Sequence, residues 1–161
     1  MPLTEDEIIR ARRVLDLISP TMVVEWASEQ LAAGRDEPQL IELAATYDHS
    51  AVVVDGLLDD LLGAFQIEPP DEQESVLYVA YAIARDILDN RVAASEGAQQ
   101  IARSRGGRTS DPIILGLLGL AYDWDDGLQA NWEGREGAQG RLEEQIRLSA
   151  AELVESVDNP E

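Results

Sequence analysis

Cysteine is absent from this chain of 161 residues, and histidine occurs only once, at position 49. Without thiols the chain can form neither a disulfide framework nor a thiolate metal site, which fits a reducing compartment. A single histidine cannot build an imidazole-rich metal site, and we interpret His49 as a residue of a surface loop. The chain carries no strong catalytic signature, and we expect neither catalytic residues nor a cofactor.

Long apolar segments are also missing. The longest run, residues 112–121 (PIILGLLGLA), is well short of the roughly 20 residues that span a bilayer. The opening sequence, MPLTEDEIIR, is acidic and amphipathic, and it lacks the basic and apolar regions of a secretory signal. We therefore expect a cytoplasmic protein that does not bind membranes.

Positive charge is scarce. Twelve basic residues, all of them arginine, stand against thirty-two acidic ones and leave a net charge of −20. Such a field repels nucleic acid and anionic lipid, so we expect neither as a partner. A basic protein partner is compatible with the field, and so is a surface that serves solubility alone.

Apolar residues recur at three- and four-residue spacing along most of the chain, which predicts one helix after another. The widest apolar stripe lies in residues 74–89, so this helix should be central, with neighbours on several sides. Residues 51–65 include three consecutive valines that could open a strand, but the helical spacing continues for three turns and favours a helix. We predict an all-α, single-domain bundle of seven or eight helices around a central apolar helix at about residues 74–89.

Two stretches interrupt this pattern. Pro69 and Pro70 prevent a helix from continuing and predict a hinge between helix groups at residues 67–71. After Trp124 the chain becomes rich in glycine, and each glycine weakens a helix by about 1 kcal/mol relative to alanine. The region after Trp124 therefore gives the weakest helical signal, and a last helix is predicted from about Gln139 to Ser156.

An acidic cluster is the first candidate site. Asp123 and Asp126 are three residues apart, with Asp125 between them, and would share a helical face. Carboxylates are the ligands that Mg²⁺ prefers, so Asp123 and Asp126 are candidate metal ligands. The exit of a helix in an acidic chain also produces such a pair by chance.

The second candidate is a group of basic residues in a predicted polar loop, residues 103–110. Arg103, Arg105 and Arg108 surround two glycines immediately before a predicted helix. Free amides at a helix start attract anions, and the arginines would add charge, so these three residues are candidates for anion binding. The alternative is a solvated loop whose arginines pair with nearby acids.

Acidic residues on two predicted helices suggest a third possibility. The residues are Asp55, Asp59 and Asp60 on the fourth helix and Asp86 and Asp89 on the central helix. All-helical nucleotide pyrophosphohydrolases hold Mg²⁺ with carboxylates on facing helices, which this arrangement resembles. Only the spacing of Asp86 and Asp89 matches, and the expected E-E-x-x-E motif does not occur before it.

The three tryptophans, Trp26, Trp124 and Trp132, are interpreted as packing groups. Trp132 lies in a loose acidic stretch and is also a candidate anchor for a partner, because aromatic anchors dominate many protein interfaces.

Four stretches resemble parts of small acidic, all-helical proteins encoded in GC-rich actinobacterial genomes. They are residues 26–34 (WASEQLAAG), 40–44 (LIELA), 83–92 (IARDILDNRV) and 96–101 (EGAQQI). The resemblance implies an all-helical fold. It supplies no catalytic residue.

The sequence therefore favours a non-enzymatic, acidic protein-interaction module that neutralises or regulates a basic protein partner, as an immunity protein or an adaptor does. The alternative is a Mg²⁺-dependent all-α phosphohydrolase that uses carboxylates on the fourth and fifth helices. A self-associating structural protein is a third possibility.

Overall fold

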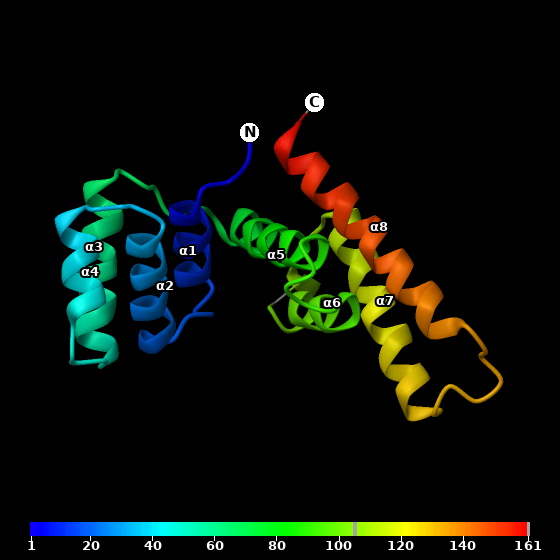
Figure 1. Cartoon of the computed structure of the whole chain (residues 1–161). Coiled ribbons are helices and arrows are strands. Elements are labelled where there is room, and N and C mark those ends of the chain that lie inside the picture. The colour runs from blue at the N-terminus through cyan, green and yellow to red at the C-terminus, as the bar shows by residue number, and fades with distance from the viewer. Residues whose placement is uncertain (105, 161) are drawn as a thin grey trace.

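The computed structural model describes residues 1–104 and 106–160, and within these ranges it is helical without any strand (Figure 1). The elements are α1 (Glu5–Val14), α2 (Pro20–Ala32), α3 (Pro38–Ala45), α4 (Ala51–Ala64), α5 (Glu72–Leu88), α6 (Ala94–Arg103), the 3₁₀ turn η1 (Gly106–Arg108), α7 (Pro112–Gln129) and α8 (Ala138–Asp158). The predicted all-α bundle of seven or eight helices is confirmed. Among the described helices, none combines the length and apolar character needed to cross a membrane.

Local sequence explains where several helices begin. At α1 the Thr4 side chain accepts a hydrogen bond from the backbone N–H of Glu7, and the Glu7 carboxylate accepts one from the N–H of Thr4. Asp71 and Glu74 form the same reciprocal pair at α5, and Asp111 caps α7. These caps satisfy N–H groups that the first turn of a helix leaves without partners.

Residues 51–64 form helix α4, although their three consecutive valines are also compatible with a strand. Val54, Leu58, Leu61 and Leu62 are fully buried. Helical spacing places these four side chains on one face, whereas a strand would turn some of them to solvent. The predicted helix is confirmed.

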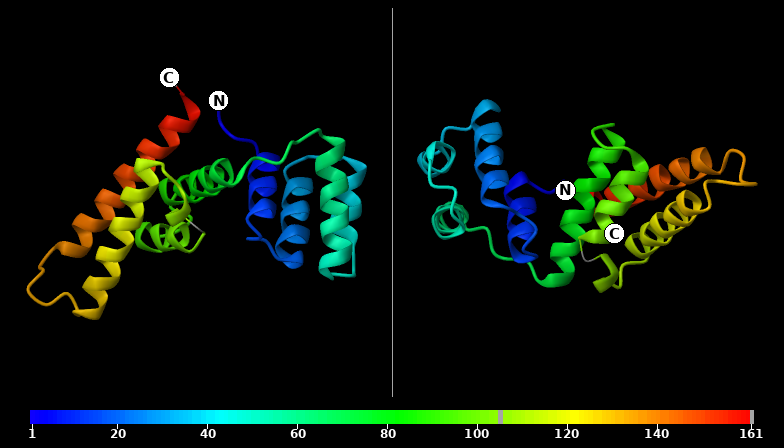
Figure 2. Two further views of the ribbon diagram at one scale, coloured as in Figure 1. Left: turned by 180° about the vertical axis from the view of Figure 1, so that it is seen from behind. Right: turned by 90° about the horizontal axis from the view of Figure 1, so that it is seen from below.

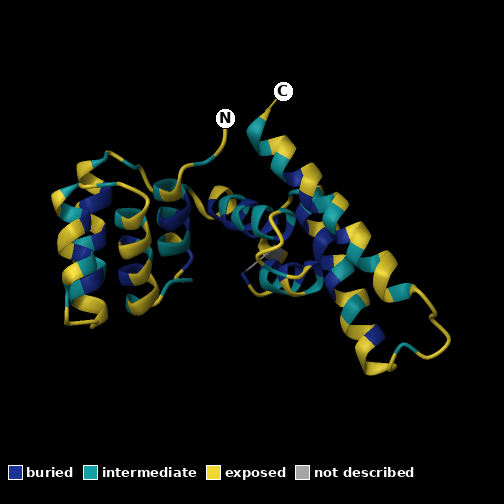
Figure 3. Cartoon of the chain, viewed as in Figure 1, coloured by how far each residue is buried: buried dark blue, intermediate teal, exposed yellow. Residues whose placement is uncertain are grey.

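The buried side chains form two hydrophobic clusters. The first joins α2, α3 and α4 with Ile9 of α1. The second joins α5 to α8 with Ala11 of α1 and with Leu15, the residue that ends α1. Figure 2 shows α2 to α4 on one side and α5 to α8 on the other, with α1 between them, and Figure 3 shows that buried positions face inward in both groups. The predicted hinge at 67–71 lies in the connection between the groups and stays a prediction.

Helix α5 is central to the second cluster, where it packs against α1, α6 and α8. Its Tyr81 hydroxyl donates a hydrogen bond to Oδ1 of Asp158 at 2.7 Å, which joins α5 to the C-terminal end of α8. Burial and the neighbouring Asp158 carboxylate raise the pKa of Tyr81. The prediction that the widest apolar stripe marks the central helix is confirmed.

Arg35, in the loop between α2 and α3, joins α1 to the first group. Its Nη1 donates to Oδ1 of Asp6 at 2.7 Å, and its Nη2 donates to Oε1 of Glu37 at 2.9 Å. The guanidinium carbon also lies 5.3 Å from the centroid of the Phe65 ring. Hydrogen bonding to Asp6 and Glu37 raises the pKa of Arg35, so its guanidinium remains charged at any ordinary pH.

Helix α7 is more regular than its glycine content suggests, because it continues through Gly127 to Gln129. The ring of Trp132 lies so close to Gly127 that a Cβ at that position would overlap it. Asn131 and Trp132 have φ values of 49° and 55°, in the left-handed region, and reverse the chain after the helix. The missing side chain therefore allows the tryptophan to fold back and pack on the helix end.

Gly97 in α6 should be essential to the contact between α5 and α6. A Cβ there would lie 2.5 Å from Cδ1 of Ile87, which is fully buried. We expect Gly97→Ala to destabilise the protein by about 1–3 kcal/mol, the range for overpacking a core. Urea unfolding followed by circular dichroism measures the change.

Gly119→Ala in α7 is the matched control, because nothing lies within 4 Å of the added Cβ. Alanine favours a helix, so this variant should be more stable by about 0.5–1 kcal/mol. Equal effects of the two substitutions would contradict the close packing at Gly97.

Candidate functional site

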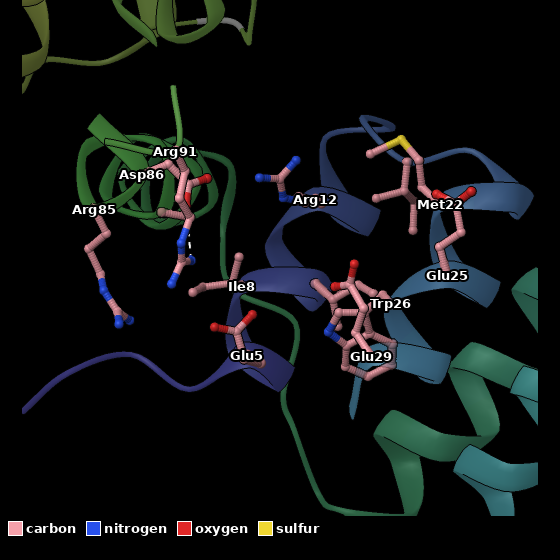
Figure 4. Close-up of a pocket in the computed structure, with 13 residues that line it drawn as sticks. Glu5, Ile8, Arg12, Met22, Glu25, Trp26, Glu29, Arg85, Asp86 and Arg91 are labelled. Carbon is pink, nitrogen blue, oxygen red and sulfur yellow. Dashed lines mark hydrogen bonds and ion pairs between the residues drawn. The ribbon is translucent and has the colours of Figure 1, made fainter. Parts of the chain in front are cut away.

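A groove lies where the two helix groups meet, between α1, α2 and α5. Its volume is about 330 Å³, near the lower end of the range for ligand pockets. Figure 4 shows the side chains around it, with α2 on one side, α5 on the other and α1 between them. We call this site the α1/α2/α5 groove.

The wall formed by α2 is negatively charged and partly apolar. Met22, Glu25, Trp26 and Glu29 line the groove at positions i, i+3, i+4 and i+7, which share one helical face. Glu25 and Glu29 are exposed, and neither takes part in the ion pairs of the described residues. The indole N–H of Trp26 is buried without a hydrogen-bond partner among these residues. The wall thus offers two carboxylates beside an apolar surface.

The part of the groove formed by α1 and α5 carries charges of both signs, because Glu5 and Asp86 line it beside three arginines. Arg12 of α1, Arg85 of α5 and Arg91, just after α5, all line it. Arg91 pairs with Asp86 at 3.3 Å. Arg85 instead extends over the ring of Tyr81, 5.8 Å from its centroid, in a cation–π contact. Three of the twelve arginines of a strongly acidic chain therefore converge on one site.

Arg12 is a partly buried charge without an ion-pair partner in the described part of the chain. Burial lowers the pKa of Arg12, and the attraction of Asp86 and Glu5 opposes this effect. A guanidinium removed from water without a close counter-ion costs free energy, and it presents donors that match a carboxylate in a bidentate arrangement. By contrast, six arginines form ion pairs among the residues that the structure describes: Arg10, Arg13, Arg35, Arg91, Arg103 and Arg108.

The predicted metal ligands Asp123 and Asp126 are exposed near the C-terminal end of α7. Asp125, between them, accepts a hydrogen bond from Nε2 of Gln99 at 2.7 Å. Within residues 1–104 and 106–160, no group of three or more histidine, aspartate or glutamate side chains is placed to hold a metal ion. The structure adds no third ligand to the pair, and its metal-binding role stays a prediction.

The predicted anion-binding arginines contact carboxylates of two different helices. Arg103 pairs with Glu96 of α6 at 3.7 Å, and Arg108 pairs with Glu72 of α5 at 3.1 Å. Arg105 lies outside the described residues. Arg103 and Arg108 thus pair with nearby acids, as the alternative interpretation of this loop expected, and anion binding stays a prediction.

The carboxylates of the phosphohydrolase alternative belong to different groups of helices. On α4, Asp55 pairs with Arg13 at 3.5 Å and Asp59 pairs with Arg10 at 3.4 Å. Asp86 of α5 lies instead in the α1/α2/α5 groove. Helices α4 and α5 are not among the closely packed helix pairs of the described chain. These contacts bring no facing set of carboxylates together.

Trp132, the candidate partner anchor, is half-buried. Its ring packs edge to face on Trp124, with the centroids 5.1 Å apart, and it covers Gly127. The interpretation as a packing group agrees with this contact, and the partner-binding role stays a prediction. His49 is exposed in the loop before α4, as interpreted from the sequence.

Comparison of the chain with protein-family models, curated proteins and solved structures found no match. A function must therefore be argued from the geometry and charge of the protein itself.

The α1/α2/α5 groove did not stand out in the sequence. One signal was present, because the spacing of Met22, Glu25, Trp26 and Glu29 places two carboxylates beside two large apolar side chains on one face of a helix. Arg12 and the α5 residues of the groove are far apart in the chain, and only packing brings them to the same site.

Arg12→Met should raise stability. The substitution keeps much of the length of the side chain and removes a partly buried charge that has no close partner, so we expect a gain of up to about 1 kcal/mol. Arg10→Met is the matched control on the same helix, because Arg10 pairs with Asp59, and its loss should leave stability unchanged or lower it by about 0.5 kcal/mol. Thermal and urea unfolding measure both. A loss of stability in Arg12→Met would show that Arg12 is satisfied within the protein.

Proposed function

We propose that this chain is a non-enzymatic, cytoplasmic protein-interaction module that binds and regulates a basic protein partner, in the manner of an immunity protein or an adaptor. The main support is the uncompensated negative charge. Ion pairs within the described residues involve eight of the thirty-two acidic side chains: Asp6, Glu37, Asp55, Asp59, Glu72, Asp86, Asp89 and Glu96. Most carboxylates are therefore not neutralised by ion pairs within the described residues, and together they produce a negative electrostatic field around the protein.

Such a field acts on association in a definite way. It speeds the diffusional encounter with a positively charged protein and suppresses encounters with acidic ones. It also repels nucleic acid and anionic lipid, and it disfavours association between copies that each carry a net charge of −20. A basic protein is the class of macromolecule that fits best.

The phosphohydrolase alternative has less support. Arg13 and Arg10 pair with Asp55 and Asp59, so these carboxylates are already partly neutralised by neighbouring arginines. A Mg²⁺ site needs ionised oxygen ligands that converge, and these pairs weaken the attraction for a cation.

Affinity capture from native cell extract tests the proposal. The tagged chain should retain a basic protein in near-stoichiometric amount. Retention should fall as washes rise from about 0.1 M to about 1 M salt, because the Debye length shrinks from about 10 Å to about 3 Å. Mass spectrometry identifies the retained protein, and the association rate of the purified pair should show the same salt dependence.

An unrelated protein of similar size and net charge, immobilised in parallel, is the control. It reveals proteins that adhere to any acidic surface. The proposal is wrong if the two baits retain the same proteins, or if the chain retains only itself as a stable oligomer.

A further inference from the structure

The charged side chains that the α2 wall gives to the α1/α2/α5 groove are both acidic, whereas α1, α5 and the residues just after α5 give it three arginines together with Glu5 and Asp86. Glu25 and Glu29 come from the α2 wall, and they are exposed. Arg12 and Arg85 come from α1 and α5, and neither forms an ion pair within the described residues. Figure 4 shows the glutamates of α2 and the arginine of α5 on opposite sides of α1.

An apolar surface lies between these charges. Ile8 of α1 is buried at the base of the groove, and Met22 and Trp26 line the α2 side. Met22 is 43% exposed. Exposed apolar surface with a charged rim is typical of a binding site.

The charges discriminate between possible ligands. A simple anion would gain from the arginines but would be repelled by the four carboxylates that line the groove, Glu5, Glu25, Glu29 and Asp86. A simple cation would gain from these carboxylates and be repelled by the arginines. A ligand with both charges and an apolar group between them is complementary to the acidic α2 wall and to the arginines across the groove, and this difference between the two sides also fixes its direction.

We infer that the α1/α2/α5 groove binds a peptide segment of the protein partner that carries an acidic and a basic side chain on either side of a large apolar one. The acidic side chain binds Arg12, which has no ion-pair partner among the described residues, and Arg85 adds positive charge to the same groove. The apolar side chain packs on Met22 and Trp26, and the basic side chain faces the glutamates of α2. This inference rests on the proposed function, because the partner's excess of basic residues supplies the cation.

Selection of displayed random peptides on the purified full-length chain tests the inference without knowledge of the partner. Enriched peptides should combine an acidic, a large apolar and a basic residue within a short segment. Fluorescence anisotropy of the labelled peptides measures their dissociation constants. Binding should weaken by about tenfold or more in the double variants R12Q/R85Q and E25K/E29K.

The matched control is E144K/E152K on α8. Glu144 and Glu152 are also exposed on one helix, and their replacement changes the net charge by the same amount as E25K/E29K. Peptide affinity should stay within about twofold in this variant, because distant surface charges are screened. Circular dichroism verifies that each variant is folded.

A reciprocal exchange of charge provides the sharpest result. A peptide whose basic residue is replaced by glutamate should bind poorly to the unchanged protein and recover its affinity for E25K/E29K. Recovery requires a direct contact, since a loss of structure cannot be reversed by changing the peptide.

Several results would overturn the inference. The first is the absence of enriched peptides. The second is enrichment of purely basic peptides that bind R12Q/R85Q normally, and the third is an equal loss of affinity in the groove variants and the control. A dimer of the chain that E25K/E29K dissociates would also contradict the inference, because the groove would then hold a second copy. If a basic partner is captured and binds both groove variants normally, the groove is not the binding site, and the proposed function stands.

If peptides bind the groove as expected but no basic partner is captured, the peptide-binding inference stands and the proposed function is wrong.

Discussion

The position of α1 between two hydrophobic clusters is the constraint on which the rest of the structure depends. Ile9 packs with α2 to α4, while Ala11 packs with α5 to α8. A helix of ten residues is marginal in isolation, so packing on both sides holds it in place. Once these faces are covered, the remaining surface of α1, with Ile8 and Arg12, faces the space between α2 and α5 and forms the base of the groove.

The distribution of arginine gives this arrangement its electrostatic character. In a chain with so few basic residues, half of the twelve arginines form ion pairs among the described residues, and some of these join different elements, as Arg35 does between α1 and the loop after α2. Arg12 and Arg85 depart from this use. Keeping a guanidinium partly buried without a close carboxylate lowers stability, which is the observation on which the proposed ligand of the groove rests.

Much of the fold was predictable from the sequence because its signals are local. The capping pairs Thr4–Glu7 and Asp71–Glu74 mark helix starts within four residues of chain, and apolar spacing identified α4 in spite of its valines. The region after Trp124 was predicted less well. Helix propensity counts Gly127 as a weakness, but the ring of Trp132 covers it, and that contact depends on a reversal of the chain.

Taken alone, the sequence determined the all-helical class, the central helix and the strong negative charge, since these follow from local spacing and from a sum over residues. Only the tertiary structure decided which charges meet. Asp55 and Asp59 became partners of α1 arginines and not candidate metal ligands facing α5, whereas Arg12 lies in the groove without an ion-pair partner among the described residues. Contacts between residues distant in the chain depend on how whole helices pack, and no local pattern encodes them.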